Sequence, residues 1–208
     1  MALKTRVLVS GIHNLGDARY CAGMGVEFMG FNFNSNDPES FSKDNYKEIV
    51  GWISGVSFVG KFGESDPSYI IDVAEQLDLD YIEVDKTSIL PHFKYLNIPL
   101  ILKIDISQIQ DWAELGKILN DYEHYVSFFN LYTTNEISEE YWIKITEYMM
   151  SYPIILGFNI TLQNINHLIE TTKLDVISIK IGHNSKYGLK SFDELAEILE
   201  AIEIDDTL

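Results

Sequence analysis

Eight short apolar runs that alternate with amphipathic segments constrain the fold of this chain more than any other feature of its sequence. Each run is rich in Val, Ile, Phe or Tyr and is mostly continuous, which is typical of strands covered on both faces. Alternation of such strands with helices predicts a parallel sheet with the helices packed outside it. The predicted strands cover Thr5–Val9, Val26–Asn32, Ser57–Phe62, Asp80–Val84, Pro99–Ile104, Tyr125–Phe129, Pro153–Leu156 and Asp175–Ile179.

The segments between these runs show helical spacing and helix-start signals. Asn14–Met24 opens on a residue suited to an N-cap, with Asp17 three positions later. Pro67–Leu77 opens on a proline at a position where a helix tolerates it, and repeats apolar residues on one face. The other predicted helices cover Asp44–Ile53, Ser88–Tyr95, Ser107–Leu119, Ser138–Met149, Thr161–Glu170 and Ser191–Ile202.

Eight strand–helix pairs in 208 residues predict an α/β fold, a single (β/α)8 TIM barrel, with residues 1–208 as one domain. The competing architecture is an open doubly wound sheet, which usually has fewer strands and a Gly-rich first turn. The G-x-G-x-x-G pattern does not follow the first predicted strand, and the phosphate loop G-x-x-x-x-G-K-[ST] does not occur. The closed barrel is therefore the favoured architecture.

Charge and cysteine content exclude several classes of function. Fifteen basic against 32 acidic residues give a net charge of -17, which repels phosphate backbones, so we expect no nucleic-acid partner. The single Cys21 excludes an internal disulfide and a cysteine-based zinc site, and the histidines lack metal-ligand spacing, so we expect no metal. No apolar run could span a bilayer, and Lys4 and Arg6 interrupt the first apolar stretch. We therefore expect no membrane partner, no signal peptide and a cytoplasmic location.

In such a barrel the chemistry lies where the strands end and the βα loops begin. Lys61, Lys103 and Lys180 fall at or near predicted strand ends. Glu83 and Asp85 lie at the end of the fourth predicted strand, near the lysines in barrel order. These side chains could form a buried acid–base cluster, with an amine nucleophile or an anion clamp. The alternative is a set of rim charges that pair at the surface and contribute little.

The loops after the seventh and eighth predicted strands each contain a glycine. In many barrels the backbone N–H groups of these two loops hold a phosphate. Gly157, Asn159, Gly182 and His183 are therefore a candidate phosphate site. The alternative is two ordinary glycine-containing turns.

The stretch Val7–Arg19, which reads VLVSGIHNLGDAR, is similar to the opening of the phosphoribosylanthranilate isomerases. That family begins with a strand ending in Lys-Ile-Cys-Gly-Ile, followed by Thr-Asn-x-x-Asp-Ala. The likeness continues through 25–33 and 59–67 to about residue 85, and it implies the same (β/α)8 barrel. The residues that match in the opening stretch are Gly11, Ile12, Asn14, Leu15, Asp17 and Ala18.

The resemblance implies an Amadori rearrangement in tryptophan biosynthesis, without cofactor or metal, on a small anionic sugar phosphate. In this reaction a general acid protonates the ring oxygen and a general base removes the C2 proton. The family places a Cys base at the end of the first strand, where this chain has Ser10, and an Asp acid at the end of the sixth, where it has Asn130. An unactivated hydroxyl is no base near neutral pH, and an amide has no titrating proton.

Other positions on the reacting face depart from the family as well. A family arginine in the second βα loop becomes Glu39, and the family stretch Gln-Leu-His-Gly becomes 83–86, Glu-Val-Asp-Lys. These changes predict weak or lost family activity. His13, Glu83 or Asp85 could substitute in proton transfer. Two alternatives stay open: a sugar-phosphate isomerase with a relocated acid and base, or a non-catalytic barrel that binds a ligand or an unidentified partner protein.

Overall fold

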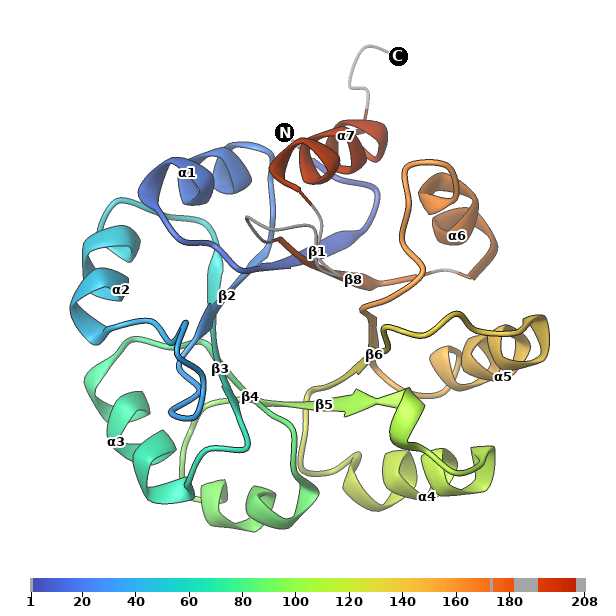
Figure 1. Cartoon of the computed structure of the whole chain (residues 1–208), viewed down its shortest axis with the longest axis horizontal. Helices are drawn as coiled ribbons and strands as arrows, with labels where there is room; N and C mark the ends of the chain where they lie inside the picture. Colours follow the sequence, from blue (N-terminus) through green and yellow to red (C-terminus); the bar gives the residue numbers. More distant parts are fainter. Residues whose placement is uncertain (1, 173, 182–190, 205–208) are drawn as a thin grey trace.

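The strands close into one parallel barrel in chain order, β1 to β8, in a computed structural model that describes residues 2–172, 174–181 and 191–204 (Figure 1). Each strand pairs in parallel with its neighbours, and β1 closes the barrel on β8. The predicted (β/α)8 TIM barrel is therefore confirmed. The strands are β1 (Arg6–Ser10), β2 (Phe28–Asn32), β3 (Ser57–Gly63), β4 (Tyr81–Val84), β5 (Leu100–Asp105), β6 (Phe128–Tyr132), β7 (Ile154–Leu156) and β8 (Val176–Lys180).

The helices lie outside the barrel and surround it (Figure 1). Most begin at the residue type that favours an N-cap; Ser191, for example, forms a complete capping box with Glu194 before the last helix. The α-helices are α1 (Leu15–Gly23), α2 (Lys43–Val50), α3 (Pro67–Gln76), α4 (Trp112–Tyr122), α5 (Glu139–Met149), α6 (Ile165–Thr172) and α7 (Phe192–Ala201).

Four predicted elements differ clearly from the structure, one of them the helix predicted from Thr161, which begins at Ile165. The helix predicted over 88–95 is a 3-10 helix, η1 (Thr87–Phe93), because Pro91 lacks the N–H that an α-helix needs. The helix predicted from Ser107 begins at Trp112 instead, after a short 3-10 helix, η2 (Ile106–Gln108). The sixth strand begins three residues later than predicted, at Phe128, which places Asn130 within the strand.

Side chains that point into the barrel change from apolar to polar along each strand. Successive side chains of a strand alternate between the two faces, so every second residue faces inward. An apolar layer fills the middle of the barrel and includes Leu8, Val59, Ile101 and Phe128. Two residues further along these four strands stand Ser10, Lys61, Lys103 and Asn130. The apolar layer thus supports a polar floor at the carboxyl ends of the strands.

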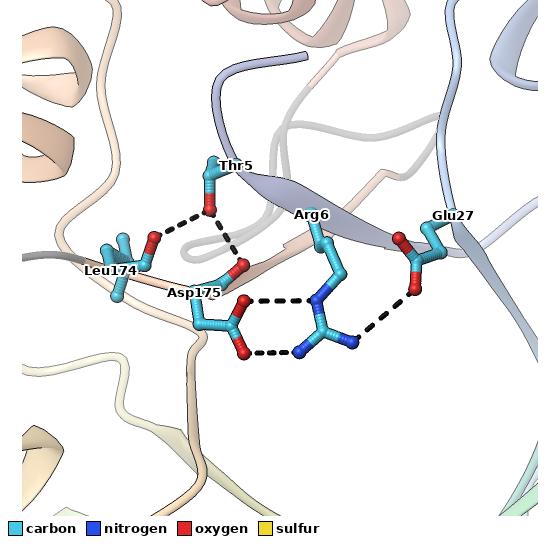
Figure 2. Close-up of polar contacts among 5 residues, drawn as sticks. All are labelled: Thr5, Arg6, Glu27, Leu174 and Asp175. Carbon is cyan, nitrogen blue, oxygen red and sulfur yellow. Dashed lines mark hydrogen bonds and ion pairs between the residues drawn. The ribbon is translucent and has the colours of Figure 1, made fainter. Parts of the chain in front are cut away.

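A cluster of polar contacts around Arg6 lies at the amino-terminal end of the barrel, and Figure 2 shows these contacts. The Arg6 guanidinium forms a two-pronged ion pair with Asp175 and a third contact with Glu27, 3.4 Å from Nη1 to Oε1. It also lies over the rings of Phe28 and Phe128, 5.7 and 5.3 Å from their centroids. These contacts tie β1 to the start of β8. No helix within the described residues is long and apolar enough to cross a membrane.

Candidate active site

A cavity of about 800 Å³ lies above the polar floor at the carboxyl ends of the strands. This is the end at which TIM-barrel enzymes carry their active sites. Its wall includes these residues predicted from the sequence: Ser10, Lys61, Glu83, Asp85, Lys103, Asn130, Gly157, Asn159 and Lys180. The exposed side chains of His13 and Glu39 do not line it, and Gly182 and His183 lie outside the described residues.

An ion pair between Lys61 and Glu83 forms the centre of the floor. Lys61 of β3 and Glu83 of β4 are register partners, and Lys61 Nζ lies 2.7 Å from Glu83 Oε1. The other carboxylate oxygen, Oε2, accepts a hydrogen bond of 2.8 Å from Asn130 Nδ2. The Glu83 side chain is only 2% exposed, whereas that of Lys61 is 17% exposed. Both carboxylate oxygens are therefore engaged, and the lysine side chain is the more exposed partner of the pair.

Burial and neighbouring charges shift the pKa values of this pair. Burial disfavours the ionised carboxylate, but the ammonium groups of Lys61 and Lys103 and the two hydrogen bonds outweigh it and lower the pKa of Glu83. For Lys61, burial disfavours the charged form and outweighs the attraction of Glu83, so its pKa is lowered. The second ammonium, Lys103, adds to that lowering.

Lys103 and Asp85 form a second, looser pair beside the first. Lys103 Nζ lies 3.7 Å from Asp85 Oδ2 and 4.0 Å from the centroid of the Tyr132 ring. Burial disfavours the Lys103 ammonium, but Glu83 and Asp85 outweigh it and raise the Lys103 pKa. Burial raises the pKa of Asp85. Lys103 therefore holds its proton more firmly than Lys61 does.

Two buried polar atoms of the floor have no hydrogen-bond partner among the residues that the structure describes: Ser10 Oγ and Asn130 Oδ1. Their residues are 3% and 2% exposed. Buried polar groups nearly always find a partner in native proteins, so an unpaired one calls for an explanation such as a bound molecule or a functional role. Ser10 Oγ can donate or accept a hydrogen bond, and Asn130 Oδ1 can accept one.

Gly30 makes room for the Lys61 side chain between β1 and β3. A Cβ at this position would lie 2.7 Å from Lys61 Cδ and 3.0 Å from Ser10 Oγ. The lysine chain therefore crosses the glycine beside Ser10 on its way to Glu83. Sequence reasoning missed Gly30 and the ring of Tyr132, although both stand at inward-facing positions of their strands, two residues from Phe28 and Asn130.

The loop after β7 supplies one wall of the cavity. A Cβ at Gly157 would lie 2.9 Å from the carbonyl oxygen of Leu131 and 3.1 Å from Asn130 Oδ1, so only glycine fits. Asn159 has a positive φ of 54°. The side chain of Asn164 holds the loop, since it accepts a bond from the N–H of Thr161 and donates one to the Asn159 carbonyl. The half of the predicted phosphate site in this loop thus lines the cavity.

Metal ligands are not grouped in the described part of the chain: no set of three or more His, Cys, Asp or Glu side chains there could hold a metal ion. Cys21 is a buried free thiol on α1, away from the cavity wall. Burial raises its pKa to about 12.

Comparison with curated proteins finds relatives that share one name. No protein-family model matches the chain. A curated N-(5'-phosphoribosyl)anthranilate isomerase from Chlorobium phaeovibrioides is 37% identical over 70 residues, 33% of this chain and 32% of that protein. The Aquifex aeolicus isomerase is 22% identical over 208 residues, 94% of this chain and 97% of that one. The matches above 30% identity span 32–39% of the length of those relatives.

Solved structures of proteins with the same name share the fold. Phosphoribosylanthranilate isomerase from Thermotoga maritima superposes with a TM-score of 0.76 at 21% identity, covering 95% of this chain and 98% of that one. A structure of such an isomerase with reduced 1-(o-carboxyphenylamino)-1-deoxyribulose 5-phosphate gives the same TM-score of 0.76 at 21% identity over 95% of this chain and 98% of that one. At this level of identity the structural likeness shows the fold.

Proposed function

We propose that this chain, a relative of the phosphoribosylanthranilate isomerases in sequence and fold, binds a phosphorylated sugar amine in its cavity and isomerises phosphoribosylanthranilate slowly. One observation carries the proposal. Ser10 Oγ and Asn130 Oδ1 are buried and unpaired at the two positions where the family resemblance implies a Cys base and an Asp acid. These two positions can therefore form hydrogen bonds to a ligand, but they transfer protons less well than the family's acid and base.

The chemistry of these two groups supports binding over proton transfer. A sugar hydroxyl can donate to Asn130 Oδ1, and another can exchange hydrogen bonds with Ser10 Oγ. Neither group titrates near neutral pH, so neither can take the C2 proton or protonate the ring oxygen efficiently. Replacing an acid and a base of this kind typically costs about 100-fold or more in rate.

Three lysines give the cavity local contacts for an anionic group, although its lining also carries four carboxylates and the chain has a net charge of -17. Lys61 pairs with Glu83, Lys103 pairs more loosely with Asp85 at 3.7 Å, and Lys180 also lines the cavity. The Gly157 N–H donates to the Leu131 carbonyl, and the backbone of 158–159 lies in the cavity wall, in a loop of the kind that binds phosphate in barrels. A phosphate ester with several hydroxyls fits this set of donors and acceptors.

The test is turnover of N-(5'-phosphoribosyl)anthranilate beside binding of the reduced product analogue. We expect calorimetric binding of the analogue and a kcat/KM at least about 100-fold below that of the Thermotoga maritima enzyme under the same conditions. The double variant Ser10→Cys, Asn130→Asp should recover about tenfold or more.

Two results would contradict the proposal in different ways. A wild-type rate equal to that of the Thermotoga maritima enzyme would contradict the proposal that the activity is reduced. Absence of analogue binding would contradict the proposal that the cavity binds a phosphorylated sugar amine.

A further inference from the structure

We propose that Lys61 is the catalytic residue of this cavity, and that its one amine both protonates the ring oxygen and removes the C2 proton of the sugar. This inference rests on the proposed function. It is carried by the position of Lys61 on the floor, by its contacts, and by the state of the other charged groups around it.

The Lys61 chain lies between the two positions where the family resemblance implies proton transfer. On one side it crosses Gly30 next to Ser10 Oγ. On the other side its ammonium contacts Glu83 Oε1, and Glu83 Oε2 accepts from Asn130. A ligand that pairs with both Ser10 Oγ and Asn130 Oδ1 therefore spans the floor above the Lys61 ammonium.

Two neighbouring titratable groups on the floor, Glu83 and Lys103, are less suited to move a proton. Both oxygens of Glu83 are engaged and its side chain is 2% exposed, so it acts as a positioning residue for the ammonium. Lys103 is stabilised in its charged form by Glu83 and Asp85, which raise its pKa. Lys61 has the opposite tendency, because burial lowers its pKa and eases release of the proton.

One amine can serve both steps without a net change in its charge. In ring opening, the bond between C1 and the ring oxygen breaks, the nitrogen lone pair forms C1=N, and the ring oxygen takes a proton from the Lys61 ammonium. The neutral amine then takes the proton from C2, the C2 electron pair forms C1=C2, and the C=N pair returns to nitrogen. The resulting enol becomes the ketone as C1 gains a proton from water and the hydroxyl of C2 loses one to water.

Two variants separate proton transfer from the structural role of the ion pair. Lys61→Arg keeps a cation beside Glu83 that does not deprotonate in proteins. The double variant Lys61→Gln, Glu83→Gln removes both charges together and leaves no unpaired buried carboxylate. Lys144→Gln is the matched control, because Lys144 pairs with Glu147 at 2.8 Å on α5, outside the cavity.

The experiment measures analogue binding and turnover of phosphoribosylanthranilate for each variant, after denaturation curves establish that it is folded. We expect both Lys61 variants to bind the reduced analogue within about fivefold of the wild type and to lose about 100-fold or more in kcat. Lys144→Gln should match the wild type in both measurements.

The possible results are distinct. Turnover retained by either folded Lys61 variant would overturn the role of Lys61. Wild-type protein that binds the analogue without any turnover would also overturn it, while the proposed ligand class would stand. Wild-type protein that fails to bind the analogue would overturn the proposed function itself.

Discussion

The amide of Asn130 donates a hydrogen bond of 2.8 Å to Glu83 Oε2, and this bond fixes which way the amide faces. Because a carboxylate only accepts, the NH2 group must point at Glu83, and the carbonyl oxygen is left unpaired at the cavity wall. The orientation also decides what an aspartate would do at this position.

Asn130→Asp should create a carboxyl pair that retains a proton at neutral pH. Two carboxyls this close cannot both ionise easily, so the pKa of one is raised. A raised pKa in the folded state costs stability near pH 7, and that cost is relieved as the pH falls through the raised value. We expect the free energy of unfolding of the variant, relative to wild type, to recover between about pH 7 and pH 5. Denaturant titrations at each pH test this, and a constant difference would contradict it.

Breaking the Lys61–Glu83 pair from one side should destabilise the fold more than removing both charges. Lys61→Gln leaves a buried carboxylate uncompensated, which typically costs about 3–5 kcal/mol. The double variant with Glu83→Gln should lose much less than the sum of the two single variants. A double-mutant cycle from urea unfolding measures this coupling, and additive losses would show that the two side chains act independently.

The rate of turnover should fall on the alkaline side before the ordinary lysine pKa is reached. The reaction begins with the Lys61 ammonium, whose fraction decreases as the pH rises through its pKa, and burial places that pKa below 10.5. The charged groups that set it are Glu83, Lys103 and Asp85. A profile of kcat/KM against pH tests the prediction; activity that stays flat up to pH 10.5 would contradict it.

Arg6→Ala should weaken the fold and leave the chemistry unchanged. The Arg6 guanidinium is about one-third exposed, so its ion pairs are partly screened, but it also covers two aromatic rings. We expect a loss of about 1–2 kcal/mol in unfolding free energy. The kcat should not change, because the cluster lies at the opposite end of the barrel from the cavity. A changed kcat in the folded variant would show coupling between the two ends.

Ser10→Cys should introduce a reactive thiol into a protein whose own cysteine, Cys21, does not react in the native state. Cys21 is fully buried and its pKa is raised to about 12, so the native wild type should not react with a thiol reagent near pH 8. A thiol at position 10 would line the cavity beside the Lys61 side chain, whose positive charge favours the thiolate. Spectroscopic titration should count one reactive thiol in the native variant and none in the native wild type. Equal native labelling of both proteins would contradict the placement of Cys21.

The fold could be predicted well from the sequence because strands and helices alternate along the whole chain. One uncertain segment therefore does not change the topology. The 3-10 helix at 87–93 and the shift of β6 escaped prediction, because Pro91 acts locally and the apolar run around Val126 does not mark a strand start.

The sequence also predicted most of the strand-end side chains that line the cavity, since strand ends follow from the strands, but it wrongly included the loop residues His13 and Glu39. It did not predict that Lys61 pairs with Glu83 or that Asn130 joins them. Those contacts depend on the register between strands and on the space over Gly30, neither of which leaves a pattern along the chain.

The apolar layer inside the barrel also has an electrical consequence. Arg6 and Ser10 are four residues apart on β1, about 13 Å along the strand, and side chains such as Leu8 fill the space between them. This layer insulates one charge cluster from the other. The cluster around Arg6 is open to counterions, whereas Glu83 is shielded from them. Added salt should therefore weaken the ion pairs around Arg6 more than the pair of Lys61 with Glu83. The salt dependence of the unfolding free energy thus separates the contributions of the two clusters to stability.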